Sequence, residues 1–404
     1  MVARVAAGAS LADEMQRVRE SRPALIDLTH GCLRRYGRVQ AIVAALARRG
    51  RPDAQVEALL WCCLYAFDSA RHAEHTVVNE AVKATGLLER WSAKGFVNAV
   101  LRSYLRERQA IEARIEQDEP ARRQHPQWWI DLVRQAYPAD WQAALSFGNT
   151  HPPMWLRVNR RRADADGYAR RLEEAGMRAQ RGGSEALLLE KPVPVESLPG
   201  FAAGEVSVQD LGAQRAARCL DLRDGQRVLD ACAAPGGKAA HMLELAELEL
   251  TALDLDASRA ERIATSLERL GLRAGIRVGD AARPGEWWDG RPFERILVDA
   301  PCSASGIARR RPDVKWLRRM QDLPVFADKQ LSLLRALWPL LSPGGKLLYV
   351  TCSVFPQEND AVVDSFLAAE AQARRQALPD GGAGQWLPAA QHDGFYYALI
   401  AKAA

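Results

Sequence analysis

The sequence predicts an α/β protein in which a doubly wound parallel sheet follows a bundle of helices. Residues from about 12 to 144 place apolar side chains at helical spacing and show no strand pattern. From about Glu205 onward, short apolar runs alternate with helical segments, as in a doubly wound sheet. The stretch between them mixes strand and helix signals. We therefore expect three domains, over residues 1–140, 150–205 and 206–404.

The composition is that of a globular protein, with 48% hydrophobic and 26% charged residues. No apolar run approaches the roughly 18 residues of a membrane span, and the N-terminus lacks the apolar core of a secretory signal. We therefore expect a cytoplasmic protein without a membrane partner. We also expect a monomer, although these features do not decide the oligomeric state. Seven cysteines without CxxC or CxxH spacing favour free thiols over a metal site. The net charge of +5 is compatible with a nucleic-acid partner but does not predict one.

The helical region begins with amphipathic segments, and Pro52-Asp53 opens a more continuously apolar helix. Cys32, Cys62 and Cys63 fall on apolar helix faces. Free cysteine usually behaves as a small core residue, so we expect these three thiols to be core packing.

The middle region is predicted as a small α+β unit with a strand at Met154–Asn159, a helix at Ala165–Ala175 and a strand at Ala186–Leu189. It is rich in arginine, and RNA contact and a solvated charged face are equally compatible with that pattern. The arginines are Arg157, Arg160, Arg161, Arg162, Arg170, Arg171, Arg178 and Arg181.

The C-terminal region alternates strands and helices. The expected strands are Arg227–Asp230, Leu250–Asp254, Gly275–Val278, Phe293–Asp299, Lys346–Thr351 and Gly394–Ile400. The expected helices are Gly237–Leu245, Ser258–Leu270 and Leu323–Leu341. In such sheets ligands bind at the carboxyl ends of the strands.

Two cysteines follow two of these strands. Asp299-Ala-Pro-Cys302 leaves one apolar run, and Cys352 leaves another. Two thiols at two strand exits predict a shared site. Asp299 and Cys302 lie on the same loop, so spacing alone favours Cys302 as a nucleophile.

The first strand leads into a glycine turn, Asp230-Ala-Cys-Ala-Ala-Pro-Gly-Gly-Lys238. Gly236 and Gly237 allow close backbone approach to a ligand, and the following helix start offers N–H donors. The spacing is neither that of a dinucleotide fold nor that of a phosphate loop, which disfavours a dehydrogenase.

Acidic residues end four successive strands: Asp230, Asp254, Asp280 and Asp299. An acid after the second strand can bind ribose hydroxyls, and Asp280 could accept from an adenine amino group. Four acids without a phosphate-binding lysine signature suit a cationic, phosphate-free nucleoside such as S-adenosylmethionine. Arg259, at the next helix start, could close over it.

These motifs resemble those of the RNA cytosine-5 methyltransferases, more narrowly the bacterial enzymes acting on small-subunit ribosomal RNA. The resemblance rests on Asp230–Lys238, Asp299-Ala-Pro-Cys-Ser303, Thr351-Cys-Ser353 and the segment Gly306–Leu317. It implies a Rossmann-like class I methyltransferase domain, an RRM-like middle unit and a NusB-like RNA-binding domain in front, where Phe96–Arg102 is the most telling phrase. It also implies S-adenosylmethionine as cofactor and 16S rRNA, free or at an early assembly stage, as substrate.

The resemblance also assigns residues. The implied cofactor-binding residues are Cys232, Ala233, Ala234, Pro235, Gly236, Gly237, Lys238, Asp254, Arg259, Asp280 and Asp299. In this family the Thr-Cys-Ser cysteine is the nucleophile and the Pro-Cys thiol assists product release, so Cys352 would attack and Cys302 would assist. Asp299 would bind N3 of the base, which for a carboxyl requires a proton and a raised pKa. Lys238 could orient Asp299 or line the cofactor loop, and a solvated lysine at the start of the helix is nearly as compatible with the sequence.

Six basic residues follow Cys302, where RNA contact is expected over a merely solvated surface. They are Arg309, Arg310, Arg311, Lys315, Arg318 and Arg319. Two alternatives remain open: a tRNA substrate for the same chemistry, and a non-catalytic NusB-type RNA-binding protein.

Overall fold

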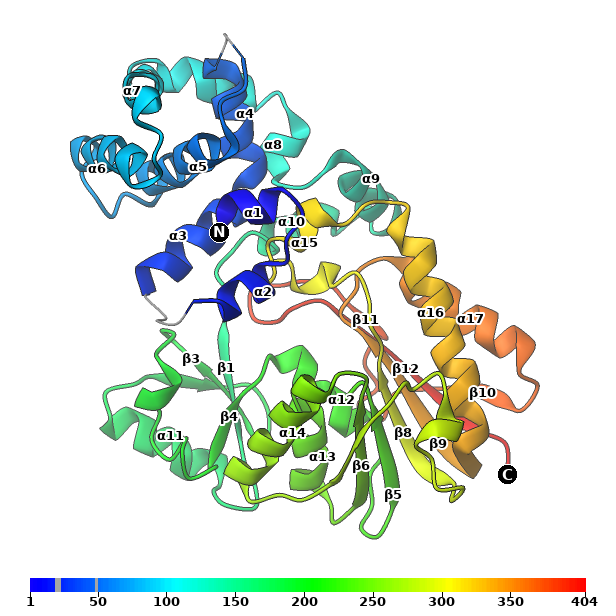
Figure 1. The fold of residues 1–404 in the computed structure, drawn as a ribbon. Helices are drawn as coiled ribbons and strands as arrows, with labels where there is room; N and C mark the ends of the chain where they lie inside the picture. Colours follow the sequence, from blue (N-terminus) through cyan, green and yellow to red (C-terminus); the bar gives the residue numbers. More distant parts are fainter. Residues whose placement is uncertain (19–22, 48–49) are drawn as a thin grey trace. The chain divides into compact units, whose positions relative to one another are not determined.

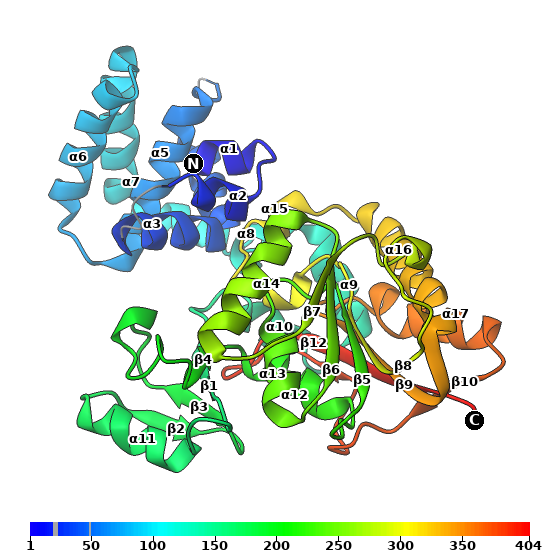
Figure 2. The same ribbon diagram turned by 60° about the horizontal axis from the view of Figure 1, so that its bottom comes forward.

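The computed structural model describes residues 1–18, 23–47 and 50–404, which form two compact units (Figures 1 and 2). The helical unit comprises Met1–His151 and the returning segment Ala308–Met320. The sheet unit comprises Pro152–Ile307 and Gln321–Ala404. The middle α+β residues therefore pack in the same unit as the large sheet, and the three-domain division stays an interpretation.

The helical unit is built from helices of 4 to 22 residues, most of which pack around one apolar core. Its helices are α1 (Val2–Ala6), α2 (Leu11–Gln16), α3 (Pro23–Arg34), α4 (Tyr36–Leu46), α5 (Ala54–Ser69), α6 (Glu74–Leu87), α7 (Lys94–Ile115), α8 (Glu119–Arg123), α9 (Gln127–Ala136), α10 (Trp141–Phe147) and α15 (Val314–Leu317). Asp53 caps α5, its carboxylate accepting from the Gln55 N–H at 3.0 Å. Cys32, Cys62 and Cys63 lie in or against this core, as predicted.

The returning segment Ala308–Met320 belongs to the helical unit, and its first residues lie largely in the interior of that unit, whereas Arg319 and Met320 are exposed. Lys315 is fully buried, and its ammonium donates to the Arg34 carbonyl at 2.9 Å and to Asn149 Oδ1 at 2.7 Å. Burial, and then Arg34, lower the Lys315 pKa far below its usual value. The Arg34 guanidinium in turn donates to the Arg309 carbonyl at 2.8 Å.

The prediction of RNA contact is therefore wrong for two of the six basic residues. Arg309 and Lys315 have no exposed surface. A buried cation and an exposed one look alike in a sequence, and here the backbone carbonyl of Arg34 and the side-chain amide oxygen of Asn149 accept from Lys315.

The smaller sheet has four antiparallel strands in the order β2-β3-β1-β4. They are β1 (Met154–Val158), β2 (Ala179–Arg181), β3 (Ala186–Leu189) and β4 (Val206–Val208), and α11 (Ala165–Glu174) accompanies them. The predicted β1, α11 and β3 are present; β2 and β4, of three residues each, carried no pattern long enough to detect.

Most arginines of this region serve the fold. Arg157 is buried and makes a two-pronged ion pair with Glu244, with both N–O distances 2.8 Å. RNA contact by Arg157 is thus excluded. Arg162 donates to the backbone carbonyls of Ala203 and Leu270, at 2.6 and 3.1 Å. Arg171 pairs with Glu205.

The larger sheet confirms the predicted α/β class. Its strand order is β10-β12-β9-β8-β5-β6-β7, with β11 pairing β12. The strands are β5 (Arg227–Ala231), β6 (Glu249–Asp254), β7 (Gly275–Val278), β8 (Phe293–Asp299), β9 (Leu341–Thr351), β10 (Ala373–Gln376), β11 (Gln385–Trp386) and β12 (Phe395–Lys402). Strands β5 to β9 pair in parallel, and β12 is antiparallel to β9.

Helices cover both faces of this sheet (Figure 1). The apolar side chains alternate along each strand: Leu229 faces one cluster with α16 (Asp322–Leu337) and α17 (Asp360–Ala369). Val228 faces the other cluster, with α12 (Leu211–Cys219), α13 (Gly237–Leu245) and α14 (Ala257–Leu270). The chain reverses its winding between β5 and β8, so the ligand crevice is expected beyond their carboxyl ends.

A buried polar link ties α13 to the start of β3. His241 Nε2 lies 2.9 Å from Glu185 Oε1, which also accepts from Arg218 Nε at 2.8 Å. Burial, and then Arg157, lower the His241 pKa from 6.5 to about 4. The imidazole is therefore neutral at pH 7 and donates to the carboxylate.

This link predicts acid sensitivity. Between pH 6.5 and 4 the unfolded His241 takes up a proton that the folded one refuses, so stability is lost as the pH falls. We expect the free energy of unfolding to drop by about 2 kcal/mol between pH 7.5 and 5 from this group alone. Urea titrations at the two pH values measure it. In His241→Gln, which keeps a donor but does not titrate, the drop should shrink by that amount; an unchanged drop contradicts the assignment.

Candidate active site at the strand exits

The structure brings the two predicted thiols together. Cys302 follows β8 and Cys352 follows β9, and these strands are parallel neighbours with Asp299 paired opposite Val350. The two Sγ atoms are 3.4 Å apart. Both cysteines are free and partly exposed. Two free thiols therefore lie side by side at the carboxyl end of the sheet.

The surroundings of Cys302 favour its protonated form. The hydrogen bond with Cys352, followed by burial and by the charges of Cys352 and Glu358, raises the pKa of Cys302 well above its usual value. Cys302 therefore keeps its proton near neutral pH, and either sulfur can be the donor in the S–H···S contact.

Asp299 ends β8 and is held by a lysine from the neighbouring helix. Lys238, in the first turn of α13, places Nζ 2.5 Å from Asp299 Oδ2. Burial would lower the Lys238 pKa, but the attraction of Asp299 outweighs it and raises the pKa above the usual value. Of the two alternatives for Lys238, the structure supports orientation of Asp299.

The loop after β5 has the backbone that a close ligand requires. Cys232 adopts φ +67° and Gly236 φ +94°. A side chain at Gly236 would also place Cβ 3.2 Å from the Ile263 Cα, so glycine is needed there for two reasons. The Ala234 N–H donates to Asp254 Oδ2 at 3.1 Å, which ties the loop to the end of β6.

Acidic groups line the next strand exits. Asp254 is 2% exposed, and its Oδ2 lies 3.3 Å from the Arg259 guanidinium. Asp280, after β7, is partly exposed and accepts from the Ala282 N–H at 2.9 Å. Contacts within the chain therefore orient both carboxylates.

Asp230 departs from the sequence prediction of four acids at strand exits. β5 continues to Ala231, so Asp230 lies within the strand and is completely buried. Burial, and then the charge of Asp299, raise the Asp230 pKa to about 8. A neutral acid that is completely buried in this way is not available to a ligand.

Sequence reasoning missed the hydroxyl cluster behind the thiols. Ser303, Ser305 and Ser353 are buried, with Oγ–Oγ distances of 3.0 to 3.2 Å among them. The repeated pair Cys-Ser, at 302–303 and again at 352–353, was the available signal. The cluster joins the loop after β8 to the loop after β9.

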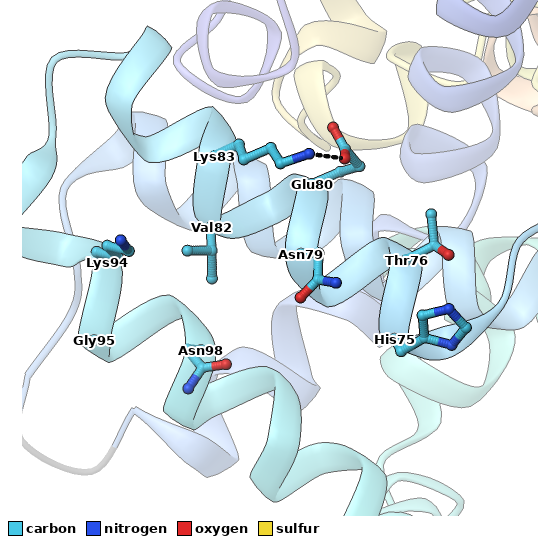
Figure 3. A pocket seen from close by; sticks show the side chains of 9 residues that line it. All are labelled: His75, Thr76, Asn79, Glu80, Val82, Lys83, Lys94, Gly95 and Asn98. Carbon is cyan, nitrogen blue, oxygen red and sulfur yellow. Dashed lines mark hydrogen bonds and ion pairs between the residues drawn. The ribbon is translucent and has the colours of Figure 1, made fainter.

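A separate groove of about 740 Å³ lies between α6 and α7 in the helical unit (Figure 3). It is lined by polar side chains, and its Glu80 pairs with Lys83 at 2.8 Å. It contains no thiol and none of the predicted site residues. The groove therefore lacks a side chain that could act as a thiol nucleophile.

Two further observations concern the described parts of the chain. No group of three or more His, Cys, Asp and Glu side chains gathers there as a metal ion would require. No helix within those ranges has both the length and the apolar character needed to cross a bilayer.

The thiol loops also depend on a glycine. The Gly306 N–H donates to the Cys352 carbonyl at 2.8 Å, and a Cβ at Gly306 would lie 2.2 Å from the Gly394 oxygen. We expect Gly306→Ala to destabilise the protein by about 1–3 kcal/mol, because backbone must move to admit the methyl group. Thermal unfolding measures the loss. Gly285→Ala, where nothing lies within 4 Å, is the control and should be near neutral; equal stability of both variants contradicts the close approach.

Comparison with known proteins agrees with this geometry. Residues 217–401 match the family described as 16S rRNA methyltransferase RsmB/F. Residues 125–196 match the ferredoxin-like domain of RsmF/B-like methyltransferases, and residues 5–106 match the NusB family.

Relatives extend over nearly the whole chain. The ribosomal RNA small subunit methyltransferase B of Pseudomonas syringae pv. tomato is 44% identical, covering 94% of this chain and 88% of its own. The ribosomal RNA small subunit methyltransferase B of Salmonella arizonae is 40% identical, and the match covers 96% of this chain and 92% of its own.

Solved structures share the fold. The crystal structure of PH0851 superposes with a TM-score of 0.83 at 22% identity, covering 99% of this chain and 97% of its own. A methyltransferase homologue from Pyrococcus horikoshii gives a TM-score of 0.62 at 25% identity, covering 70% and 98%. With its thiol pair, its glycine loop and these relatives, the chain belongs to the RsmB/F family of 16S rRNA methyltransferases.

Proposed function

We propose that this protein transfers a methyl group from S-adenosylmethionine to carbon 5 of a cytosine in 16S rRNA. The observation that carries the proposal is the contact of 3.4 Å between the Cys302 and Cys352 sulfur atoms at the exits of β8 and β9. Cytosine carbon 5 is a poor nucleophile until a thiolate adds to carbon 6, and a second group must then help the thiol to leave. Two adjacent thiols suit these two tasks.

The cofactor's residues are proposed from the fit of the loop after β5. Cys232–Lys238 would lie against the ligand, where the φ of +94° at Gly236 permits close backbone approach. Asp254 would bind the ribose hydroxyls, Asp280 the adenine amino group, and Arg259 would lie over the ligand. When bound, S-adenosylmethionine supplies an electrophilic methyl group on its sulfonium. The acidic residues would attract the positive charge of that sulfonium.

The cofactor assignment is testable by binding alone. Asp254→Asn keeps the shape but weakens acceptance of two ribose hydroxyls, so we expect affinity for S-adenosylhomocysteine to fall by about 1.5–3 kcal/mol, or roughly 10- to 100-fold. Isothermal titration calorimetry measures it. Asp256→Asn, at the adjacent cap of α14, is the matched control and should bind as the parent does. Equal affinity of all three proteins would remove Asp254 from the site.

Cys352 is proposed as the nucleophile. Its sulfur adds to carbon 6 of the cytosine, and carbon 5 then takes the methyl group from the sulfonium, which leaves S-adenosylhomocysteine. A base removes the carbon-5 proton, and the Cys352 sulfur leaves carbon 6 with the bonding electrons. The protonated Cys302 beside it assists by donating a hydrogen bond to the departing sulfur. The raised pKa of Cys302 supports this order, because a thiol that keeps its proton does not compete as a nucleophile.

The two roles predict opposite phenotypes. Cys352→Ala should abolish methylation and form no protein–RNA adduct. Cys302→Ala should still attack but release slowly, so an adduct should accumulate. Denaturing gels with labelled 16S rRNA distinguish the outcomes, and Cys219→Ala, a buried thiol of the same unit, serves as the control. An adduct that accumulates in Cys352→Ala and not in Cys302→Ala would reverse the roles.

The proton for N3 of the base is proposed to come from the Lys238–Asp299 pair. A lone carboxyl would need a proton of its own to donate. Lys238 Nζ lies 2.5 Å from Asp299 Oδ2, and the attraction of Asp299 outweighs burial and raises the Lys238 pKa, so the ammonium is the protonated member of the pair. Attack at carbon 6 builds negative charge on the ring, which such a proton stabilises.

We expect Lys238→Met to slow single-turnover methylation by roughly 10²- to 10⁴-fold. Lys238→Arg keeps the charge and should retain more of the rate. Affinity for S-adenosylhomocysteine is measured alongside, and a loss of binding as large as the loss of rate would reassign Lys238 to the cofactor loop.

The substrate is proposed as 16S rRNA, free or at an early stage of assembly, bound in part by the helical residues 1–140, with the enzyme acting as a monomer. Bisulfite sequencing of total RNA from cells with and without the gene tests the substrate. A single cytosine of 16S rRNA should lose its signal; loss in tRNA alone would overturn the proposal.

A further inference from the structure

The buried carboxylate of Glu358 has no part in the steps above, yet it contacts both thiol loops. Glu358 ends a short turn, Pro356–Glu358, that follows the Cys352 loop and precedes α17. Its side chain has no exposed surface. Burying a carboxylate costs several kcal/mol of folding free energy unless hydrogen-bond donors surround it. The donors around Glu358 therefore show which parts of the chain it fixes.

Three donors converge on the Glu358 carboxylate. The Ser303 N–H donates to Oε1 at 2.8 Å, which fixes the residue directly after Cys302. The Ser353 hydroxyl donates to Oε2 at 2.6 Å, which fixes the residue directly after Cys352. Gln330 Nε2 donates to Oε1 at 3.1 Å and also to the Pro301 carbonyl at 2.9 Å, directly before Cys302.

The turn itself is anchored from the sheet. Tyr349, in β9, donates its hydroxyl to the Glu358 carbonyl at 2.6 Å. The neighbouring Asn359 accepts from the Thr351 hydroxyl at 2.6 Å and donates to the Ser353 carbonyl at 3.0 Å. The carboxylate is therefore held by β9 and cannot follow either loop if that loop moves.

We propose that Glu358 is a positioning residue that holds the loops after β8 and β9 together, so that the Cys302 and Cys352 sulfur atoms stay in contact. One carboxylate oxygen holds the loop of Cys302, and the other holds the loop of Cys352. Glu358 touches neither substrate nor cofactor in this account. The inference rests on the proposed function. Glu358 would maintain the contact between Cys302 and Cys352, the two thiols to which product release and attack on the cytosine are assigned.

The charge of Glu358 contributes to the same division. It is among the groups that raise the pKa of Cys302, after the hydrogen bond with Cys352, burial and the charge of Cys352. The charge of Glu358 is thus one of the causes, after these three, that favour the protonated form of Cys302.

Contact between the thiols can be measured without RNA or cofactor. Diamide oxidises two thiols to a disulfide while its N=N bond is reduced to the hydrazine, and the rate depends on how often the two sulfurs meet. Peptide mass mapping identifies the Cys302–Cys352 crosslink among the free cysteines. We expect Glu358→Ala to form this crosslink at least roughly tenfold more slowly than the parent. Glu358→Gln, which keeps the size and an acceptor, should recover most of the rate.

Val363→Ala controls for a general loss of stability. Val363 is buried on α17 beside the turn and takes no part in the carboxylate's hydrogen bonds. It should lower the melting temperature and leave the crosslinking rate unchanged. If Glu358→Ala does not fold, Ser353→Ala removes the donor at 2.6 Å and should slow crosslinking in the same direction. Crosslinking at the parent's rate in both Glu358→Ala and Ser353→Ala overturns the inference.

Methylation provides a second readout. With Cys302 displaced, Glu358→Ala should accumulate the protein–RNA adduct, as Cys302→Ala does, and Glu358→Gln should not. If the parent forms neither adduct nor methylated RNA, the proposed function fails, while the crosslinking result still decides the role of Glu358.

Discussion

The parallel pairing of β5, β8 and β9 is the constraint on which the site depends. Asp299 lies opposite Val350, and Val298 lies opposite Ala231, so three successive strands end at one level. The glycine loop and the two thiol loops must therefore leave the sheet side by side. The site cannot form without this register, because its closest side-chain contacts join residues 50 and 61 positions apart in the sequence.

The apolar runs predicted this sheet well, and the reason is physical. A central strand is buried on both faces, so its middle residues are apolar, and Phe293–Asp299 was predicted with its observed ends. Gly275–Val278, a mostly exposed strand at the edge of the sheet, was also predicted with its observed ends. The three-residue strands β2 and β4 are too short to show a period. β9 begins at Leu341, earlier than predicted, because Ser342-Pro-Gly-Gly345 reads as a turn and yet continues the strand.

Charged residues were harder to interpret than apolar ones. Asp230 was expected at a strand exit, but a strand longer by one residue leaves it inside. Lys315 and Arg157 were predicted as part of basic surfaces. In the structure Lys315 donates to the Arg34 carbonyl and to Asn149, and Arg157 pairs with Glu244. Glu358 was not noticed at all, because no local pattern marks a side chain whose partners lie 5, 28 and 55 positions away. Partners distant in sequence decide the environment of a charge, and only the fold brings them together.

The central claim is that both thiols act on one base and that Cys352 forms the bond to it. RNA carrying 5-fluorocytidine at the target position tests this directly, because fluorine cannot leave as a proton does and the adduct persists after methyl transfer. The parent enzyme should yield a stable, methylated RNA adduct, and peptide mass mapping should place it on Cys352. An adduct on Cys302, or methylation without any adduct, would contradict the account.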